Sequence, residues 1–378
     1  MTNSLHLWTP GMYDYRGGIQ VFSQFFLQAL CDALPQANLE LFIKNDCRSG
    51  VPSLPVTHYH CGGDWPQPAR TVAFASSLFI RAFKTRPALI ITTHLHFCLA
   101  AYYLKKWLDI PYWTVAHGIE SWNIEDPELQ RALHHADRIL AVSTYTRNRL
   151  LKEQNLHPEN VAVLPNTFNP ERFQIGPKPK YLLDRHHLTP SQPVIFTVTR
   201  LEGSEAYKGY DQILRCLTAI RSQLPNVRYL IGGKGPDMER VKQMIRDLGL
   251  QENVILLGFV SDEELPDYYN LCDVFTMPSC GEGFGIVFLE ALSSGKPVLA
   301  GNKDGSVDAL HFGDFGVLVD PEDFEQIGKN LLLILNKEHR HPLIYQPERL
   351  RESVIQTYGF SRFRERLSQF LCEADGHF

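Results

Sequence analysis

The chain has 378 residues, enough for two domains at a typical size of about 150 residues each. Its composition is that of an ordinary globular protein, with 44% hydrophobic residues, 21% charged residues and a net charge of −5. There is no basic or acidic tail, so a nucleic-acid partner is not indicated. The apolar runs are shorter than the ~20 residues of a membrane span, and the first residues show no signal-peptide pattern.

The eight cysteines are scattered along the chain and include no C-x-x-C pair. This distribution indicates neither a zinc site nor a disulfide framework. We therefore expect a protein of the reducing cytoplasm that holds no metal and no other cofactor.

Short apolar segments alternate with longer helix-periodic segments, a pattern typical of doubly wound α/β proteins with parallel strands. In the first half the expected strands are LHLW, LELFIK, VTHYH, ALIITTH, PYWTVA, RILAVS and NVAVLP. GGIQVFSQFFLQALCDAL has the apolar spacing of an amphipathic helix. A second helix is expected to begin at Asp126-Pro127, with the aspartate as N-cap.

The pattern breaks between Asn166 and Gln192, where prolines are frequent, and then restarts. The second set of strands is PVIFTVTR, VRYLIGG, VILLGF, DVFTMPS, PVLAG and GVLV. Ser261 with Glu264, and Asp320 with Pro321, predict helix starts. We expect an N-terminal domain over 1–170, a linker over 171–192, a C-terminal domain over 193–354, and a last helix within 355–378 that packs back towards the N-terminal domain.

The segment GEGFGIVFLEALSSGKPVLA reads as a glycine-rich loop that opens onto a helix. Glycine lets the backbone approach a ligand closely, and a helix N-terminus favours an anion such as phosphate. Glu282 in this loop suits neutral sugar hydroxyls, and Glu290 on the helix suits a second set of hydroxyls. From local chemistry alone, the alternative is that Glu282 is a loop charge and Glu290 marks a solvent-facing helix surface.

Two cations follow another strand of the second half. Arg200 ends VIFTVTR and Lys208 follows in the next loop, at the edge where open α/β sheets bind ligands. They would hold a diphosphate there, or they are ordinary surface charges. The glycine turn IGGKGPD lacks the pattern of a P-loop, so ATP hydrolysis is not indicated.

These motifs resemble the retaining glycosyltransferases of family 4, which have the GT-B fold of two Rossmann-like domains facing a cleft. The resemblance rests on Arg200, on Lys208-Gly209, on GKGP and LLGFV, and above all on Glu282-Gly-Phe-Gly with Glu290. It implies that Glu282 binds the donor sugar and that Glu290 holds the ribose. It also implies that Arg200 and Lys208 hold the diphosphate. The remaining donor-binding residues that it implies are Gly235, Phe259, Val260, Gly283, Phe284 and Gly285.

In the first half the candidate residues are glycines and histidines that follow strands. Gly17-Gly18 precedes the first helix, and the family places a similar pair near the donor phosphate; a plain tight turn is the alternative. His117 matches the family's histidine that faces the donor sugar. His94 and His96 are expected to line the acceptor pocket. No third and fourth ligand has zinc spacing, and the G-x-G-x-x-G of a dinucleotide dehydrogenase is absent.

We therefore expect a retaining, metal-independent hexosyltransferase that uses a nucleotide sugar, UDP-glucose or else GDP-mannose. The acceptor would be a sugar or lipid-linked saccharide in exopolysaccharide synthesis. A nucleotide-sugar epimerase on the same fold and a non-catalytic nucleotide-sugar-binding subunit are the alternatives. AAYYLKKWLD, with Lys105 and Lys106, is a candidate for peripheral contact with the inner face of the cell membrane, and core packing with solvated lysines is its alternative.

Overall fold

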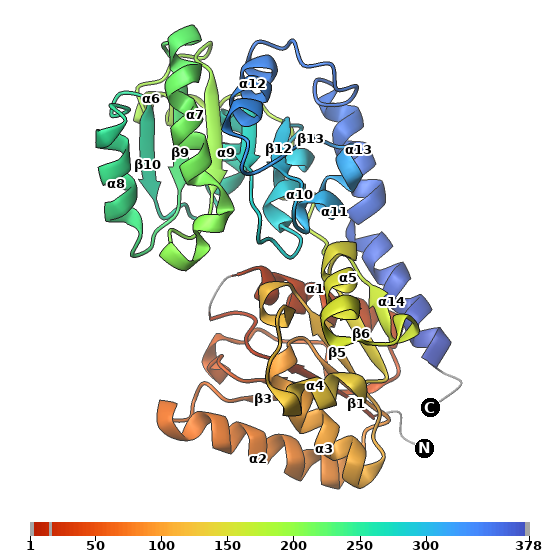
Figure 1. Ribbon diagram of the computed structural model, residues 1–378. Helices are drawn as coiled ribbons and strands as arrows, with labels where there is room; N and C mark the ends of the chain where they lie inside the picture. The colour runs from red at the N-terminus through yellow and green to blue at the C-terminus, as the bar shows by residue number, and fades with distance from the viewer. Residues whose placement is uncertain (1–3, 15–16, 375–378) are drawn as a thin grey trace. The chain divides into compact units, whose positions relative to one another are not determined.

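A computed structural model describes the backbone of residues 4–14 and 17–374, and the side chains of these residues except 204–206 and 374 (Figure 1). The chain forms two compact units. Unit 1 is Met1–Thr167 with Phe360–Phe378, and unit 2 is Phe168–Gly359. Each unit contains one parallel sheet covered by helices, so the predicted fold class of two Rossmann-like α/β domains is confirmed.

Unit 1 contains a seven-stranded sheet with the order β3-β2-β1-β4-β5-β6-β7, and every pairing is parallel. Its strands are β1 (Ser4–Thr9), β2 (Asn38–Ile43), β3 (His58–Cys61), β4 (Leu89–Thr92), β5 (Tyr112–Ala116), β6 (Arg138–Ala141) and β7 (Val161–Val163). Its helices are α1 (Gly18–Ala33), α2 (Gln67–Thr85), α3 (Cys98–Leu108), α4 (Pro127–His134), α5 (Thr144–Gln154) and α14 (Phe360–Ala374), with short 3-10 turns η1 (Arg48–Gly50), η2 (Leu95–Phe97), η3 (Ile119–Ser121) and η4 (Pro158–Asn160).

The C-terminal helix α14 packs against α1 through aromatic side chains. Phe363 lies edge-on to Phe22, with ring centroids 5.7 Å apart, and Phe360 lies 5.9 Å from Phe25. Aromatic pairs at these separations add to the stabilisation that comes from burying apolar area. The last helix of the chain is therefore part of the core of unit 1.

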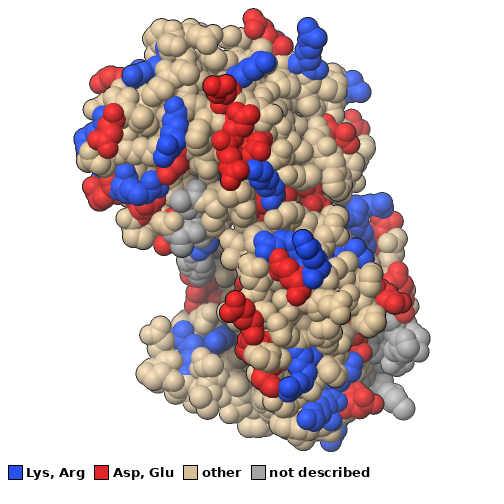
Figure 2. All heavy atoms as spheres, viewed as in Figure 1, with Lys and Arg blue, Asp and Glu red and all other residues tan. Residues whose placement is uncertain are grey.

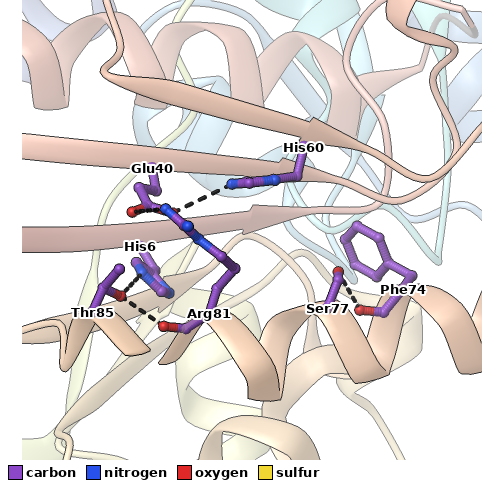
Figure 3. Close-up of polar contacts among 7 residues, drawn as sticks. All are labelled: His6, Glu40, His60, Phe74, Ser77, Arg81 and Thr85. Carbon is purple, nitrogen blue, oxygen red and sulfur yellow. Dashed lines mark hydrogen bonds and ion pairs between the residues drawn. The ribbon is translucent and has the colours of Figure 1, made fainter. Parts of the chain in front are cut away.

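Helix α2 is joined to the sheet by a partly buried cluster of polar side chains (Figure 3). The guanidinium of Arg81 donates two hydrogen bonds to Glu40 on β2, at 2.6 and 3.0 Å, and His60 on β3 lies 3.3 Å from the same carboxylate. His6 Nε2 lies 2.9 Å from the hydroxyl of Thr85. Burial alone would raise the pKa of Glu40, but the hydrogen bonds from Arg81 and the nearby positive charges hold it below its ordinary value. Arg81 therefore faces inward.

Unit 2 contains a six-stranded parallel sheet with the order β10-β9-β8-β11-β12-β13. Its strands are β8 (Val194–Val198), β9 (Arg228–Gly232), β10 (Val254–Gly258), β11 (Val274–Met277), β12 (Val298–Gly301) and β13 (Val317–Val319). Its helices are α6 (Lys180–Arg185), α7 (Tyr210–Gln223), α8 (Met238–Asp247), α9 (Leu265–Leu271), α10 (Ile286–Ser293), α11 (Ser306–Ala309), α12 (Phe324–Leu335) and α13 (Pro347–Tyr358), with 3-10 turns η5 (Gly203–Lys208) and η6 (His311–Gly313). Apolar residues of α7, α8 and α12 share one core cluster with the strands.

The structure differs from the sequence at the expected linker, 171–192. This segment lies inside unit 2 and contains α6. Its polar groups are tied to the unit: the Gly176 N–H donates to Asn270 Oδ1 at 2.9 Å, and Lys178 pairs with Asp273 at 2.7 Å. The prolines therefore shape a surface segment of the domain and do not separate two domains.

Two other expected boundaries shift in the structure. The helix expected at Asp320-Pro321 begins at Phe324, because Asp323 is the N-cap and accepts the Gln326 N–H at 2.9 Å. The segment that belongs to unit 1 at the end of the chain starts at Phe360, five residues later than the expected 355. Asp126 caps α4 as predicted, since its carboxylate accepts the Glu128 N–H.

Both sheets reverse their strand order once. In unit 1 the reversal lies between β1 and β4, and in unit 2 it lies between β8 and β11. In open α/β sheets, ligands bind outside the carboxyl ends of the strands at such a reversal. These two edges are therefore where a site is expected in each unit.

Candidate functional site

In unit 2 the predicted donor residues follow strands that are neighbours in the sheet. Arg200 follows β8, Glu282 follows β11, and these two strands flank the reversal. The loop that ends at Gly235 follows β9, and Phe259 with Val260 follows β10. The sheet thus brings residues that lie up to 82 positions apart, Arg200 and Glu282, to one edge of the same unit.

Lys208 and Glu282 are in direct contact at this edge, where the ammonium of Lys208 donates to Oε1 of Glu282. Their loops are joined by the main chain as well, since the Cys280 N–H donates to the carbonyl of Tyr207 at 3.0 Å. Gly209 has a φ of +88°, and a side chain there would lie 2.4 Å from the carbonyl oxygen of Pro278. Glycine at 209 therefore lets the Lys208 loop lie directly on the Glu282 loop.

The glycine loop ends at the N-terminus of α10, as the sequence predicts. Gly285 is the N-cap, with a φ of +89° that favours glycine. Among the described residues, no backbone acceptor takes the N–H groups of Gly283, Phe284 and Gly285. These three amides lie immediately before an eight-residue helix, whose N-terminus favours an anion.

Glu290 is half-buried on α10, and its carboxylate has a protein partner. The hydroxyl of Tyr269, on α9, donates to Oε2 of Glu290 at 2.8 Å, and Tyr269 is fully buried. Burial raises the pKa of Glu290, while the Tyr269 hydrogen bond and the charge of Arg172 act against that shift. The buried hydroxyl of Tyr269 thus orients the Glu290 carboxylate. Sequence analysis did not single out Tyr269 or Arg172, because neither belongs to a local motif.

The neighbouring loops bring a glycine turn and an exposed aromatic ring to the same edge. A side chain at Gly235 would lie 2.0 Å from the carbonyl oxygen of Leu201, so the turn packs directly on the segment after Arg200. Arg200 is exposed to solvent. Phe259 is 69% exposed, and the ammonium of Lys234 lies 6.0 Å from its ring centroid. An exposed ring at this edge offers a flat apolar surface.

Asp304, which the sequence motifs did not predict, contacts the glycine loop and is fully buried. It follows β12, the strand next to β11, and its carboxylate accepts the Glu282 N–H at 2.7 Å. The only sequence signal was an acidic residue after a predicted strand, in GNKDGS.

In unit 1, Gly17 and Gly18 stand between β1 and α1. Residues 15 and 16 lie outside the described part of the chain. Gly17 is the extended N-cap of α1, and a side chain built at Gly18 would meet no atom of the described residues within 4 Å. Unlike Gly209 or Gly235, Gly18 therefore has open space beside it.

His117 follows β5 and is a neutral hydrogen-bonding group. Its Nε2 lies 2.8 Å from the carbonyl oxygen of Thr93, which only accepts, so Nε2 carries the hydrogen and Nδ1 is an acceptor. The ring also packs edge-on against Phe22, with centroids 4.8 Å apart. Burial lowers the pKa of His117 to about 4, although the Thr93 hydrogen bond acts in the opposite direction. His117 is therefore uncharged at neutral pH.

His94 and His96 follow β4, the strand beside β5. His94 is buried and caps η2, since its Nδ1 accepts the N–H of His96 at 3.2 Å, and burial lowers its pKa to about 4. His96 is exposed, and its ring lies 4.2 Å from that of His94. The structure thus brings both histidines to the edge that carries His117, and gives His94 a structural partner. Within residues 4–14 and 17–374, no three His, Cys, Asp or Glu side chains are grouped as metal ligands.

Two family models match the chain. The model "Glycosyltransferase Family 4" matches residues 25–172, and "Glycosyl transferases group 1" matches residues 183–352. Together they cover most of both units. The chain belongs to glycosyltransferase family 4. The predicted resemblance is confirmed.

Two relatives show which activities occur among similar sequences. A GDP-mannose-dependent alpha-(1-6)-phosphatidylinositol monomannoside mannosyltransferase of Mycolicibacterium smegmatis is 33% identical over 224 residues, 56% of this chain and 57% of the relative. A mannosylfructose-phosphate synthase of Agrobacterium fabrum is 25% identical over 217 residues, 55% of this chain and 46% of the relative. The alignments thus span about half the length of these relatives.

Solved structures share the fold of the whole chain. Sucrose-phosphate synthase from Thermosynechococcus elongatus superimposes with a TM-score of 0.81 at 18% identity, covering 100% of both chains. Anabaena HepE in complex with UDP-glucose gives a TM-score of 0.76 at 17% identity, covering 98% of this chain and 99% of HepE. At these identities the likeness establishes the GT-B fold and nothing finer.

Proposed function

We propose that this chain is a retaining, metal-independent hexosyltransferase that moves a hexose from a nucleoside diphosphate to an acceptor hydroxyl. The observation that carries the proposal is the meeting of Lys208 and Glu282 at the strand reversal of unit 2, beside the amides of Gly283–Gly285. In this proposal Glu282 binds sugar hydroxyls and Glu290 binds the ribose. His117 accepts a hydrogen bond from the donor sugar through Nδ1.

The chemistry that this arrangement supports is electrostatic. When the glycosyl bond breaks, negative charge builds up on the leaving diphosphate, and preorganised donors stabilise it. Arg200, Lys208 and the loop amides are the groups proposed for this task. The leaving phosphate would then help to deprotonate the acceptor on the same face of the sugar, which retains the anomeric configuration.

The donor base and sugar need a direct test. The relative that is 33% identical uses GDP-mannose, as its name states, while a structural neighbour was solved with UDP-glucose. We propose that the donor is one of these two, with UDP-glucose preferred. A thermal-shift screen of both, followed by turnover, separates them because a true donor stabilises the native state by mass action.

An Arg200→Ala variant tests catalysis against simple binding. We expect sugar transfer to fall much more strongly than nucleotide binding. If transfer is unchanged, the proposed role of Arg200 is wrong. If the wild type converts donor to another nucleotide sugar without acceptor, the epimerase alternative holds, and if it binds donor without turnover, the binding-subunit alternative holds.

We further propose that the acceptor is a saccharide, free or lipid-linked, and that unit 1 contacts a membrane surface. No helix in the described residues is long and apolar enough to cross a bilayer. Large apolar side chains are nevertheless exposed on α2 and α3: Val72 (70%), Ile80 (66%), Phe83 (47%) and Trp107 (56%). In Figure 2 the lower left of the view is mostly tan, whereas Lys, Arg, Asp and Glu atoms gather at the lower right.

On α2, Arg81 faces inward to Glu40 (Figure 3), whereas the neighbouring Ile80 is exposed. Lys84, Arg86 and Lys106 are exposed beside it, a combination that suits an anionic bilayer. Of the two lysines expected to touch a membrane, Lys105 instead pairs with Asp137 at 2.6 Å.

Sedimentation with vesicles tests this surface. We expect binding to vesicles of phosphatidylcholine with phosphatidylglycerol, weaker binding to phosphatidylcholine alone, and loss of binding in Ile80→Glu with Phe83→Glu. Phe312→Glu, which changes an exposed phenylalanine of unit 2, is the matched control. Equal sedimentation of the double variant and the wild type would contradict the proposal.

A further inference from the structure

The buried carboxylate of Asp304 binds the main chain of the glycine-rich loop that contains Glu282, here called the donor loop. Its Oδ2 accepts two hydrogen bonds, from the Ser279 hydroxyl and from the Glu282 N–H, both at 2.7 Å. Its Oδ1 accepts the Ser306 N–H at 2.9 Å. Asp304, Ser279 and Ser306 are all fully buried, so no water competes for these contacts. A carboxylate suits this place because it only accepts hydrogen bonds.

Gly305 contacts the second polar group of the Glu282 main chain, its carbonyl oxygen. Its N–H donates to the carbonyl oxygen of Glu282 at 2.8 Å. A side chain at Gly305 would lie 2.0 Å from the carbonyl oxygen of Gly283, so only glycine allows this approach. Both polar groups of the Glu282 main chain are therefore held by the loop after β12, while the Glu282 side chain contacts Lys208.

We propose that Asp304 is a positioning residue for donor binding: it fixes the main chain of Glu282 so that the Glu282 carboxylate and the following amides are set for the donor sugar and phosphate. The inference rests on the proposed function of Glu282. It goes further because it assigns a role to a residue of a different loop, the one after β12.

The charge of Asp304 makes this contact sensitive to pH. Burial raises the pKa of Asp304 to about 6; the Glu282 carboxylate adds to the rise, and the hydrogen bonds from Glu282 N–H, Ser306 and Ser279 oppose it. The other titratable groups nearby are Cys280, on the donor loop, and Lys303, whose ammonium is directed to Asp320 and Glu322. Protonation turns one acceptor oxygen into a donor, which weakens the grip on Glu282.

Asp304→Asn tests the proposal, since asparagine keeps the shape and loses an acceptor and the charge. We expect the donor KM at pH 7.5 to rise on the order of tenfold, because a buried charge-assisted hydrogen bond is lost. The acceptor KM should not change. In the wild type the donor KM should rise as the pH falls through about 6, and in Asp304→Asn this rise should be absent.

Two further variants separate positioning from general damage to the fold. Ser279→Ala removes the other donor to the same oxygen and leaves the Glu282 contact, so its effect on donor KM should be clearly smaller. Asp314→Asn changes an exposed aspartate of the same unit and should have no effect. Equal effects of Asp304→Asn and Ser279→Ala would overturn the assignment to Glu282, as would an unchanged donor KM or a rise shared by donor and acceptor.

Hydrogen exchange gives a readout that does not depend on turnover. The Glu282 amide should exchange faster in Asp304→Asn than in the wild type. Suppose that the wild type transfers sugar from none of the nucleotide sugars tested, while the Glu282 amide exchanges faster in Asp304→Asn. The proposed function then fails, and the positioning contact stands. If the exchange of this amide is unchanged, the positioning proposal itself is overturned.

Discussion

The two units place their candidate residues at the same kind of sheet edge but build these edges differently. In unit 2 the edge consists of main chain held by glycines, as at Gly209 and Gly285, with paired charges set between the loops. In unit 1 the edge carries neutral histidines, and Gly18 has open space beside it. A site that binds phosphate needs fixed charges and amides, whereas one that binds hydroxyls can use neutral side chains.

The two edges also differ in how well they tolerate amino-acid substitutions. At the edge of unit 2, a side chain added at Gly209 or Gly305 would meet a carbonyl oxygen at 2.4 Å or less. In unit 1, His94 and His117 act through side chains, each of which also hydrogen-bonds one main-chain group, the His96 N–H and the Thr93 carbonyl. We therefore expect substitutions in unit 2 to affect donor use more strongly than those in unit 1.

The largest effect is expected at Glu282. Glu282→Gln removes the charge that faces Lys208 and the proposed contact to sugar hydroxyls. We expect kcat to fall by roughly 100-fold, as when one preorganised group of a catalytic site is lost, with the nucleotide Kd little changed. Steady-state kinetics and calorimetry check this, with Asp314→Asn as control. If Glu282→Gln kept the wild-type kcat, the proposed role of Glu282 in sugar binding would be wrong.

The next effect concerns Glu290 and its buried partner. Glu290→Gln should raise the Kd of the nucleoside diphosphate roughly tenfold, because a charge-assisted contact to the ribose is lost. Tyr269→Phe should raise it by about threefold, since it removes only the hydrogen bond that orients the carboxylate. Calorimetric titration with UDP and GDP measures both, and equal Kd values for wild type and Glu290→Gln would refute the ribose role.

Acid should weaken unit 1. Burial lowers the pKa of His6, His94 and His117 to about 4, from an ordinary 6.5. Each therefore stabilises the native state fully above pH 6.5, and this stabilisation is lost as the pH falls towards 4. Asp304 in unit 2 has the opposite sign, because its raised pKa favours the protonated native state as the pH falls through about 6.

Tryptophan fluorescence can follow this difference, because all five tryptophans lie in unit 1. We expect the thermal midpoint seen by fluorescence to fall on the order of 5 °C between pH 7 and pH 5. His6→Gln, which stays neutral throughout, should flatten the slope. A midpoint that does not change over this range would contradict the proposed neutrality of the buried histidines.

The smallest effect is expected from removing metal ions. Because Arg200, Lys208 and backbone amides are proposed to meet the charge of the leaving diphosphate, EDTA should leave the rate of sugar transfer unchanged. The same assay with added Mg²⁺ or Mn²⁺ is the control. Activity that is lost in EDTA and restored by either ion would refute metal independence.

The alternation of strands and helices made the fold predictable, because apolar periodicity reflects burial directly. Glu282 and the glycines around it were also within reach, since a glycine-rich loop before an apolar helix is a local pattern. Asp304 and Tyr269 were not, because each acts through a residue far away in sequence: Glu282 is 22 positions from Asp304, and Glu290 is 21 from Tyr269. The linker was predicted in the wrong place because prolines indicate irregular backbone. They do not show whether that backbone is packed within a domain or lies between two domains.

The order of the two units along the chain determines which of them can fold first during synthesis. Unit 2 is one continuous stretch, Phe168–Gly359, whose two ends pair as a bridge between Phe168 and Gly359. Unit 1 lacks the aromatic partners of Phe22 and Phe25 until α14 is made. During synthesis, unit 2 can therefore complete its core while unit 1 is still waiting for its last helix, and a chain truncated before Phe360 would expose phenylalanines of α1.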